Sequence, residues 1–363
     1  MTETAILKAL SNVQEPDLGK DLVTLNMIKD IVIDGNNVSF TIILTTPACP
    51  MKDLMSTAST NAVKLLVNKD ANVTVNFTSN TTSNRKDNNV LPNVKNIIAV
   101  ISGKGGVGKS TVAANLALAL AAGGAKVGLM DADIYGPSVP IMFGVRGERP
   151  MMKEVNGKGV IVPLEKFGMK LMSIGLLVDE KNAVVWRGPM ASSAIKQFVT
   201  EVDWGDLDYL VIDMPPGTGD IHLTIMQTVP VTGVVIVTTP QQVALADAKK
   251  GIAMFAQAQI NVPIIGLVEN MAYFTPAELP DNKYYIFGKD GGKRLAEEYD
   301  LNFLGQIPLV QSIRESGDDG VPAMMSNDDL AKQPFVNFAA NAVRNIAIRN
   351  ANLPTTNVIE LMN

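Results

Sequence analysis

One short run, residues 103 to 110, constrains the fold more than any other part of the sequence. It reads Gly-Lys-Gly-Gly-Val-Gly-Lys-Ser and satisfies the pattern G-x-x-x-x-G-K-[ST] of a phosphate-binding loop. The apolar run 97–102 precedes it and the helix-forming segment 110–122 follows it, which is the context that the pattern requires. Such a loop turns successive backbone N–H groups and a helix N-terminus toward phosphate. The sequence therefore predicts a nucleotide site inside an α/β domain.

The chain after residue 94 has the pattern of a parallel sheet. Short runs rich in Val and Ile alternate with helical segments, as expected of strands that are buried on both faces. The expected strands are 97–102, 126–130, 209–212, 234–238, 264–268 and 303–307, and the expected helices are 110–122, 192–199, 245–258, 291–299 and 329–349. This order predicts a doubly wound α/β domain with a mostly parallel sheet over residues 94–349.

Residues 1–77 predict a second, smaller domain of α+β type. The expected elements are a helix near 4–10, β-rich runs at 22–33 and 38–45 joined by a tight reversal at 34–37, a helix at 51–67 and a strand at 73–77. Residues 78–93 are polar and poor in apolar side chains, so we expect a flexible linker there. Residues 350–363 form a C-terminal tail.

Charge and composition exclude several functional classes. The 363 residues carry a net charge of -5, which disfavours a nucleic-acid partner because such proteins need a basic surface. The longest stretch without Asp, Glu, Lys or Arg, 221–246, is interrupted by Pro and Gln, so we expect no membrane span. The N-terminus has an acid where a secretory signal has basic residues. These observations predict a globular protein of the cytoplasm.

The general motif assigns roles to two loop residues. Lys109 is expected to reach the β and γ phosphates of a bound nucleotide, and the Ser110 hydroxyl is expected to bind Mg²⁺. Acidic residues follow two expected strands at their carboxyl ends, where α/β sheets bind ligands, namely Asp131 and Asp133 after one strand and Asp213 after another. Carboxylates placed there hold a metal-bound water or orient an attacking water, although each is also a common turn or helix-cap residue.

Three blocks resemble Mrp/ApbC-type iron-sulfur cluster carriers, which are P-loop ATPases with an N-terminal iron-sulfur assembly domain. The blocks are Asp-Ala-Asp-Ile-Tyr-Gly-Pro-Ser at 131–138, Trp-Arg-Gly-Pro-Met at 186–190, and Ile-Asp-Met-Pro-Pro-Gly-Thr-Gly-Asp-Ile at 212–221. The match spans residues 97 to about 345. The run Thr-Thr-Pro-Ala-Cys-Pro at 45–50 is similar to the small assembly module of this family.

The resemblance implies more specific roles for the nucleotide site. Asp133 would position the attacking water, Asp213 would belong to the Mg²⁺ shell, and Asp131 would assist either. Asn270 would present a donor and an acceptor to the adenine edge, and Arg314 would flank the base. The catalytic residues implied are Lys104, Lys109 and Asp133, and the residues implied to contact ATP are Gly103, Lys104, Gly105, Gly106, Val107, Gly108, Lys109, Ser110, Thr111, Asn270 and Arg314.

The early lysine, Lys104, is not required by the general motif. The loop with two lysines resembles that of MinD, ArsA and the nitrogenase iron protein, in which this lysine contacts the nucleotide of the facing subunit. The resemblance therefore implies a nucleotide-dependent homodimer. The alternative is a solvated loop lysine without a role.

The cysteine content departs from the family. Family members carry a C-x-x-C after the Asn-Met pair, whereas the run 271–280 has no cysteine and Cys49 is the sequence's only one. A [4Fe–4S] cluster is held by four thiolates, and two copies of this chain offer two. Cys49 precedes the expected helix N-terminus, which favours thiolate, and Glu15 and Asp17 are candidate oxygen ligands. Alternatively, Cys49 is a small buried hydrophobe and the two acids form a turn.

The prediction is thus a homodimeric, Mg²⁺-dependent ATPase that binds Fe-S clusters and transfers them to apoproteins together with the assembly machinery. One alternative is an ATP-dependent scaffold or chaperone without a cluster. The other is a ParA-like or MinD-like positioning ATPase, which is disfavoured because the tail after Arg349 has no basic residue. His222, the single histidine, is expected to be structural because phosphoryl transfer depends on positioning and charge.

Overall fold

The computed structural model describes residues 1–85, 90–155, 157–178, 188–276, 278–279 and 281–359. It divides into two compact units, each of which is described by itself below. The first unit contains Met1–Thr82 and Ala347–Leu353, and the second contains the rest of the described chain.

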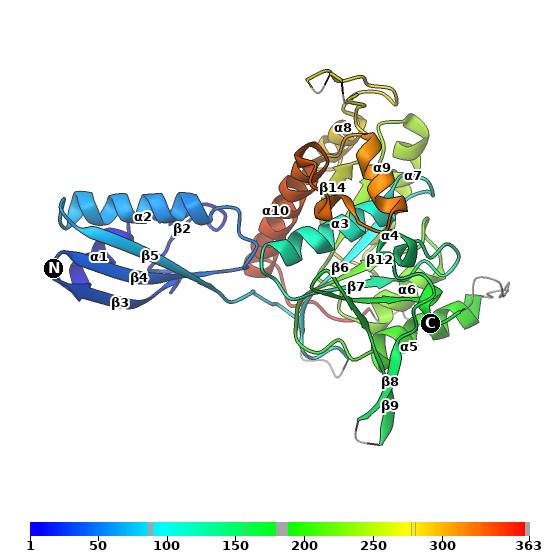
Figure 1. Cartoon of the computed structure of the whole chain (residues 1–363), viewed down its shortest axis with the longest axis horizontal. Coiled ribbons are helices and arrows are strands. Elements are labelled where there is room, and N and C mark those ends of the chain that lie inside the picture. The colour runs from blue at the N-terminus through cyan, green and yellow to red at the C-terminus, as the bar shows by residue number, and fades with distance from the viewer. Residues whose placement is uncertain (86–89, 156, 179–187, 277, 280, 360–363) are drawn as a thin grey trace. The chain divides into compact units, whose positions relative to one another are not determined.

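The larger unit is built on one eight-stranded sheet with the strand order β10-β11-β7-β12-β6-β13-β14-β15 (Figure 1). All neighbouring pairs are parallel except β10 and β11, which are antiparallel. The strands are β6 (Val94–Ser102), β7 (Val127–Asp131), β10 (Leu164–Lys166), β11 (Met169–Ser173), β12 (Leu207–Asp213), β13 (Gly233–Thr238), β14 (Ile264–Glu269) and β15 (Phe303–Gln306). The predicted doubly wound, mostly parallel sheet is confirmed.

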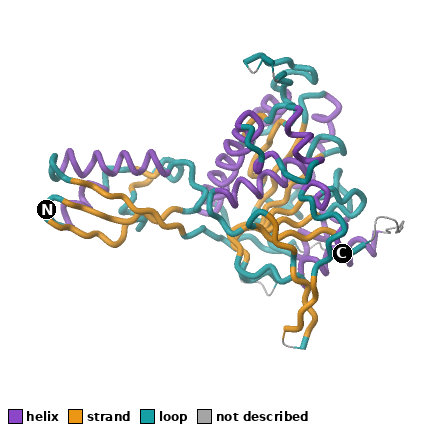
Figure 2. Tube along the Cα trace, viewed as in Figure 1, coloured by secondary structure: helices purple, strands orange, loops and turns teal. Residues whose placement is uncertain are grey.

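Helices lie on both sides of this sheet (Figure 2). They are α3 (Lys109–Ala122), α4 (Val139–Met142), α5 (Gly188–Glu201), α6 (Asp220–Thr228), α7 (Gln242–Phe255), α8 (Gly291–Glu298), α9 (Gln311–Asp318) and α10 (Asp329–Asn352). One face of β6, with Ile97, Ala99 and Ile101, shares an apolar core with α5 to α8. Helix α3 packs on β6, β7 and β12. Because apolar area is removed from water on both faces, every residue of the central strands β7 and β13 is buried.

Parallel pairing brings the carboxyl ends of the central strands to one edge of the sheet. Asp213 at the end of β12 pairs in register with Asp131 at the end of β7 and with Val100 of β6, two residues before that strand ends at Ser102. Residues more than 100 positions apart in the sequence therefore meet at this edge, which is where open α/β sheets bind ligands.

The segment between β7 and α5 was not predicted. It contains an antiparallel hairpin of β8 (Met151–Val155) and β9 (Lys158–Val162), which extends away from the large sheet, and then β10 and β11 (Figure 1). Every residue of β8 is exposed, so this strand lacks the buried Val and Ile run from which the other strands were predicted.

The small unit is a three-stranded sheet with helix α2 along one face (Figure 1). Its elements are α1 (Glu3–Leu10), β1 (Gln14–Glu15), β2 (Lys20–Asp21), β3 (Ile28–Asp34), β4 (Asn37–Leu44), α2 (Lys52–Leu66) and β5 (Asn72–Ser79). The predicted reversal is present, because Asp34 pairs with Asn37 across a turn in which Gly35 has φ +57°. Residues 22–27 are turns and not strand, since the Asp21 carboxylate accepts the N–H groups of Val23 and Thr24.

Described residues of the expected flexible linker, 78–93, form hydrogen bonds with neighbouring strands. β5 extends to Ser79, and the N–H of Asn80 donates to Leu44. The Ser83 hydroxyl donates to the Lys95 carbonyl at 2.7 Å. Asn80 and Ser83 are thus bonded to strands β4 and β6, and residues 86–89 lie outside the described residues. The tail is also bonded where it is described, since the N–H of Thr356 donates to Asn84 and that of Ile359 to Met226.

Candidate nucleotide site

The loop between β6 and α3 has a backbone that only glycine allows at several positions. Gly106 and Gly108 have φ of +82° and +80°, in the left-handed region that side chains disfavour. A Cβ on Gly103 would lie 2.2 Å from the backbone of Asp247, and one on Gly108 would lie 2.2 Å from Asn270 Nδ2. The glycines of the motif thus allow both the curl of the loop and its close contact with α7 and the end of β14.

Lys109 lies in a buried cluster with two of the predicted acids. Its Nζ atom donates to Asp213 Oδ1 at 2.6 Å, and it lies 3.8 Å from Asp133 Oδ2 and 3.4 Å from the Ser110 hydroxyl oxygen. Lys109 is 6% exposed and Asp213 is 0% exposed, so the pair is shielded from water. The structure therefore brings the phosphate-binding lysine of the motif within reach of both Asp133 and Asp213.

Asp213 has one oxygen that takes no part in this pairing. Its Oδ2 atom is buried and has no hydrogen-bond partner within the described part of the chain. Burial raises the pKa of Asp213, and Lys109 opposes that shift. A buried acceptor without a partner costs free energy unless a ligand uses it. Carboxylate and hydroxyl oxygens are the ligands that Mg²⁺ prefers, so Ser110 and Asp213 fit a magnesium ion at this edge of the sheet.

Asp131 holds the loop that carries Asp133. Its Oδ1 atom accepts the N–H of Asp133 at 3.1 Å, and its Oδ2 atom accepts the Ser173 hydroxyl at 2.9 Å and the N–H of Val139 at 3.3 Å. Burial, with the nearby charge of Asp213, raises the pKa of Asp131 to about 8. Both oxygens are thus engaged by protein donors, which favours a role in shaping the loop over the predicted role in the Mg²⁺ shell.

Asn270 and Arg314 line one cavity of about 470 Å³ next to the loop, together with Thr111. The amide of Asn270 is oriented by a buried hydrogen bond from Nδ2 to the Val107 carbonyl at 2.8 Å. One of its two N–H donors therefore holds the phosphate-binding loop, and the second N–H and the oxygen remain for a ligand. Arg314 is exposed and donates to Asp318 at 2.7 Å and to Glu315 at 3.0 Å.

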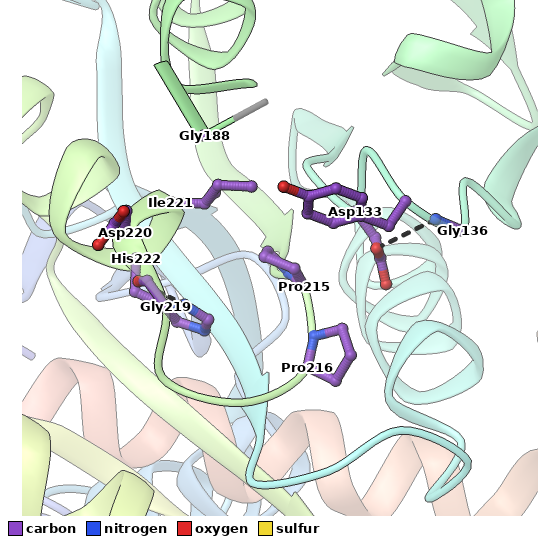
Figure 3. A pocket seen from close by; sticks show the side chains of 10 residues that line it. Asp133, Gly136, Gly188, Pro215, Pro216, Gly219, Asp220, Ile221 and His222 are labelled. Carbon is purple, nitrogen blue, oxygen red and sulfur yellow. Dashed lines mark hydrogen bonds between the residues drawn. The ribbon is translucent and has the colours of Figure 1, made fainter. Parts of the chain in front are cut away.

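A second cavity of about 400 Å³ contains Asp133 in its wall. It is lined by the loop after β7, including Asp133 and Gly136, and by the loop after β12 (Figure 3). Gly188, from the predicted 186–190 block, also lines it, while Trp186 and Arg187 lie outside the described residues. His222 forms part of the wall, a placement that no pattern in the sequence indicated beyond its closeness to Asp213.

The structure places Cys49 half-buried in the small unit, which supports the alternative of a packed side chain more than that of a reactive thiolate. The side chain packs against the core of the small unit, and α2 begins only at Lys52. Burial raises the pKa of the Cys49 thiol, Asp17 and Glu15 raise it further, and the N–H of Met51 opposes these shifts. The Glu15 carboxylate accepts the N–H of Asp17 at 2.9 Å, as a turn acid does. No group of three or more His, Cys, Asp or Glu side chains within the described ranges is arranged to hold a metal ion.

No helix among the described residues has both the length and the apolar character needed to cross a membrane.

Comparison with known proteins gives two matches to family models. A family described as NUBPL iron-transfer P-loop NTPase matches residues 93–346, and a family described as iron-sulfur cluster assembly protein matches residues 3–75. The first match contains every predicted nucleotide-site residue, and the second contains Cys49.

Individual relatives extend over nearly the whole chain. The iron-sulfur cluster carrier protein of Synechocystis sp. is 49% identical over 344 residues, which are 94% of this chain and 97% of the relative. The carrier protein of Escherichia coli (strain K12) is 44% identical over 321 residues, covering 88% of this chain and 85% of the relative. A nucleotide-binding protein from Archaeoglobus fulgidus, solved in complex with ADP, is 39% identical with a TM-score of 0.55 over 63% of this chain and 88% of that one. The chain therefore belongs to the ParA-type family of NUBPL iron-transfer P-loop NTPases.

Proposed function

We propose that this protein hydrolyses ATP with Mg²⁺ and uses the hydrolytic cycle to carry iron-sulfur clusters to apoproteins. The observation that supports hydrolysis most strongly is the buried cluster of Lys109, Asp213 and Asp133 at the phosphate-binding loop. The names of the relatives support an iron-sulfur cluster as the group that is carried, since two of those compared above are iron-sulfur cluster carrier proteins.

The contacts among Lys109, Asp213 and Asp133 suggest how binding of the terminal phosphate changes the conformation of the chain. When a triphosphate enters the loop, Lys109 exchanges its bond to Asp213 for phosphate oxygens, which releases the loops after β7 and β12 from the lysine. Ser110 and Asp213 would hold Mg²⁺, which neutralises phosphate charge when bound. Asp133 then orients the attacking water, and the two loops change position with the nucleotide state.

The cavity lined by Asn270, Thr111 and Arg314 favours adenine because a hydrogen bond to Val107 fixes the orientation of the Asn270 amide. One N–H of its Nδ2 group bonds the Val107 carbonyl, and the second N–H and the amide oxygen pair with N7 and the 6-amino group of adenine, whereas guanine presents two acceptors there. We expect Asn270→Ala to reduce the preference for ATP over GTP by roughly 10-fold, since the hydrogen bonds involved are to neutral groups. Calorimetric titration with both nucleotides measures it, with Arg314→Ala as the control that leaves the preference unchanged. An unaltered ratio in Asn270→Ala would contradict this assignment.

We propose that the active form is a homodimer in which Lys104 of one copy completes the site of the other. The two-lysine loop supports this proposal, and so does the placement of Lys104 on the loop itself, where its side chain is partly exposed. A lysine on this loop can neutralise charge on the nucleotide of a facing subunit.

The iron-sulfur cluster is best treated as a substrate that the protein binds transiently. One chain supplies the single thiol of Cys49, so a homodimer supplies two of the four thiolates that a [4Fe–4S] cluster uses. We propose that the donor or the apoprotein client supplies the remaining ligands during transfer. We also place this activity in the cytoplasm, where ATP is available and thiols stay reduced.

Anaerobic reconstitution with iron and sulfide tests the cargo. We expect wild type to take up iron at a stoichiometry below one cluster per chain, and Cys49→Ala to take up none, since Cys49 is the only thiol. Iron analysis and absorbance spectra measure uptake, and Cys49→Ser is the matched control for the size of the side chain.

A second candidate function is an ATP-dependent scaffold that binds no cluster. The observation that favours it is the absence of cysteine in the run 271–280, where family members carry C-x-x-C. If neither wild type nor Cys49→Ala takes up iron while both hydrolyse ATP, the scaffold function is correct and the carrier function is not.

A further inference from the structure

A buried histidine lies just after the loop that follows Asp213. His222 is the only histidine in the sequence, is 0% exposed, and lies in the first turn of α6. Its Nδ1 atom lies 3.3 Å from the carbonyl oxygen of Gly219. Pro215, at the other end of the segment 215–219, lines the same cavity as the ring, and the carbonyl groups of Gly219 and Pro215 raise the pKa of His222 against the effect of burial. The ring is thus hydrogen-bonded to the Gly219 end of the loop, and its Nε2 atom has no hydrogen-bond partner among the described residues.

The other side of the same loop is attached to the strand that leads into the phosphate-binding loop. The N–H of Gly217 donates to the Ser102 carbonyl at 2.9 Å, and the N–H of Met214 donates to Val100 at 3.1 Å. Ser102 is the last residue of β6. The loop 215–219 therefore lies between the imidazole and the start of the phosphate-binding loop, and its position depends on both.

The cavity beside this loop also contains Asp133, the residue proposed above to orient the attacking water. Asp133 lines one wall, and Pro215, Gly219 and His222 line the other (Figure 3). Asp133 is 3.8 Å from Lys109 Nζ, the group expected to bind that phosphate. A water oriented by Asp133 is thus confined on its far side by the loop that His222 contacts.

The ring itself is uncharged at neutral pH. Burial lowers the pKa of His222 to about 4, and the positive charge of Lys109 lowers it further against the two carbonyls. A neutral imidazole has one N–H donor and provides no cation for phosphate. What it contributes to the site is a hydrogen bond and the volume that supports the loop.

We propose that His222 is a positioning residue for ATP hydrolysis, which holds the segment 215–219 against the phosphate-binding loop so that the attacking water is confined beside Asp133. This inference rests on the proposed hydrolysis and adds a residue to it. The contact is indirect, because the ring acts through the loop backbone and touches neither phosphate nor water.

Two substitutions separate the hydrogen bond from the volume. His222→Asn keeps an N–H donor, and His222→Leu keeps a similar volume without one. We expect His222→Leu to lower kcat by roughly 10- to 100-fold, the size of effect caused by a small misplacement of reacting groups, with little change in the Kd for ATP. His222→Asn should recover most of the lost kcat. Ile225→Val, on the buried face of the same helix, is the control and should keep the kcat of wild type.

Nuclear magnetic resonance of the imidazole tests the inference without measuring ATP hydrolysis, because His222 is the single histidine of the sequence. Its ¹⁵N resonances in wild type should shift between the complex with ADP and that with a non-hydrolysable ATP analogue, both with Mg²⁺, since the loop moves with the terminal phosphate. Unchanged resonances would mean that the ring does not follow the nucleotide state and would overturn the inference.

The kinetic outcomes distinguish this inference from the function on which it rests. If wild type does not hydrolyse ATP, the proposed function fails. If wild type hydrolyses ATP and His222→Leu does so equally well, only the positioning role fails. It also fails if His222→Leu loses ATP affinity in parallel with kcat, or melts far below His222→Asn, because those results indicate a purely structural side chain.

Discussion

Lys109→Ala should abolish ATP hydrolysis, with kcat/KM lowered on the order of 10³-fold or more, because it removes the buried lysine that is expected to contact the developing phosphate charge. Isothermal calorimetry should also find no Mg²⁺-dependent binding of ATP. Lys104→Ala is the internal control for binding, since it removes a second lysine from the same loop. Unchanged binding and hydrolysis in Lys109→Ala would contradict the assignment of the phosphate site.

The same substitution has a second effect, on stability. Asp213 is fully buried and pairs with Lys109 at 2.6 Å, so removing the lysine leaves a buried carboxylate without its cation. Breaking a buried pair from one side typically costs about 3–5 kcal/mol. We therefore expect Lys109→Ala to melt well below wild type, and Lys109→Ala with Asp213→Asn to regain most of that stability without regaining hydrolysis. The double variant shows that the loss of activity is not a loss of folding.

Lys104→Ala should lower kcat by about 10² to 10³-fold, the effect of removing one donor from a preorganised site, while the Kd for ATP changes little. The reason is that Lys104 is expected to contact the nucleotide of the facing subunit in the transition state and not in the initial complex. Steady-state hydrolysis and calorimetry on the same preparation measure the two quantities. Equal turnover in Lys104→Ala and wild type would show that this lysine is only a solvated loop residue.

Mixing two inactive variants tests whether Lys104 acts across the dimer. In a heterodimer of Lys104→Ala with Asp133→Asn, one site has an intact Asp133 and faces an intact Lys104. Random pairing of equal amounts should therefore restore about one quarter of wild-type turnover, since half of the dimers are mixed and each has one complete site. A mixture no more active than its components would place Lys104 in its own subunit's site or remove it from the reaction.

The sequence was most informative where one local pattern determines the backbone. The glycines of the loop predict its shape, because Gly106 and Gly108 need positive φ and Gly103 and Gly108 leave no room for a Cβ. The six buried parallel strands were predicted because Val and Ile runs are typical of strands covered on both faces. The strands β8, β10 and β11 were missed because β8 is exposed, β10 has three residues and β11 has no Val or Ile, whereas the Val-Ile-Val run of β9 was overlooked.

The sequence by itself determined the fold class, the phosphate-binding loop and the acids at the ends of β7 and β12, since each depends on residues that are close together along the chain. Only the tertiary structure decided how those groups divide their roles, because charge, burial and hydrogen bonding depend on neighbours distant in the sequence. The folded chain pairs Lys109 with Asp213 and brings the Nδ1 atom of His222 to the carbonyl of Gly219. It also gives both carboxylate oxygens of Asp131 hydrogen-bond donors, from the backbone of Asp133 and Val139 and from the Ser173 hydroxyl. It also showed that Cys49 is a half-buried thiol whose pKa is raised, because its partial burial against the core outweighs the N–H of Met51 at the start of the nearby helix.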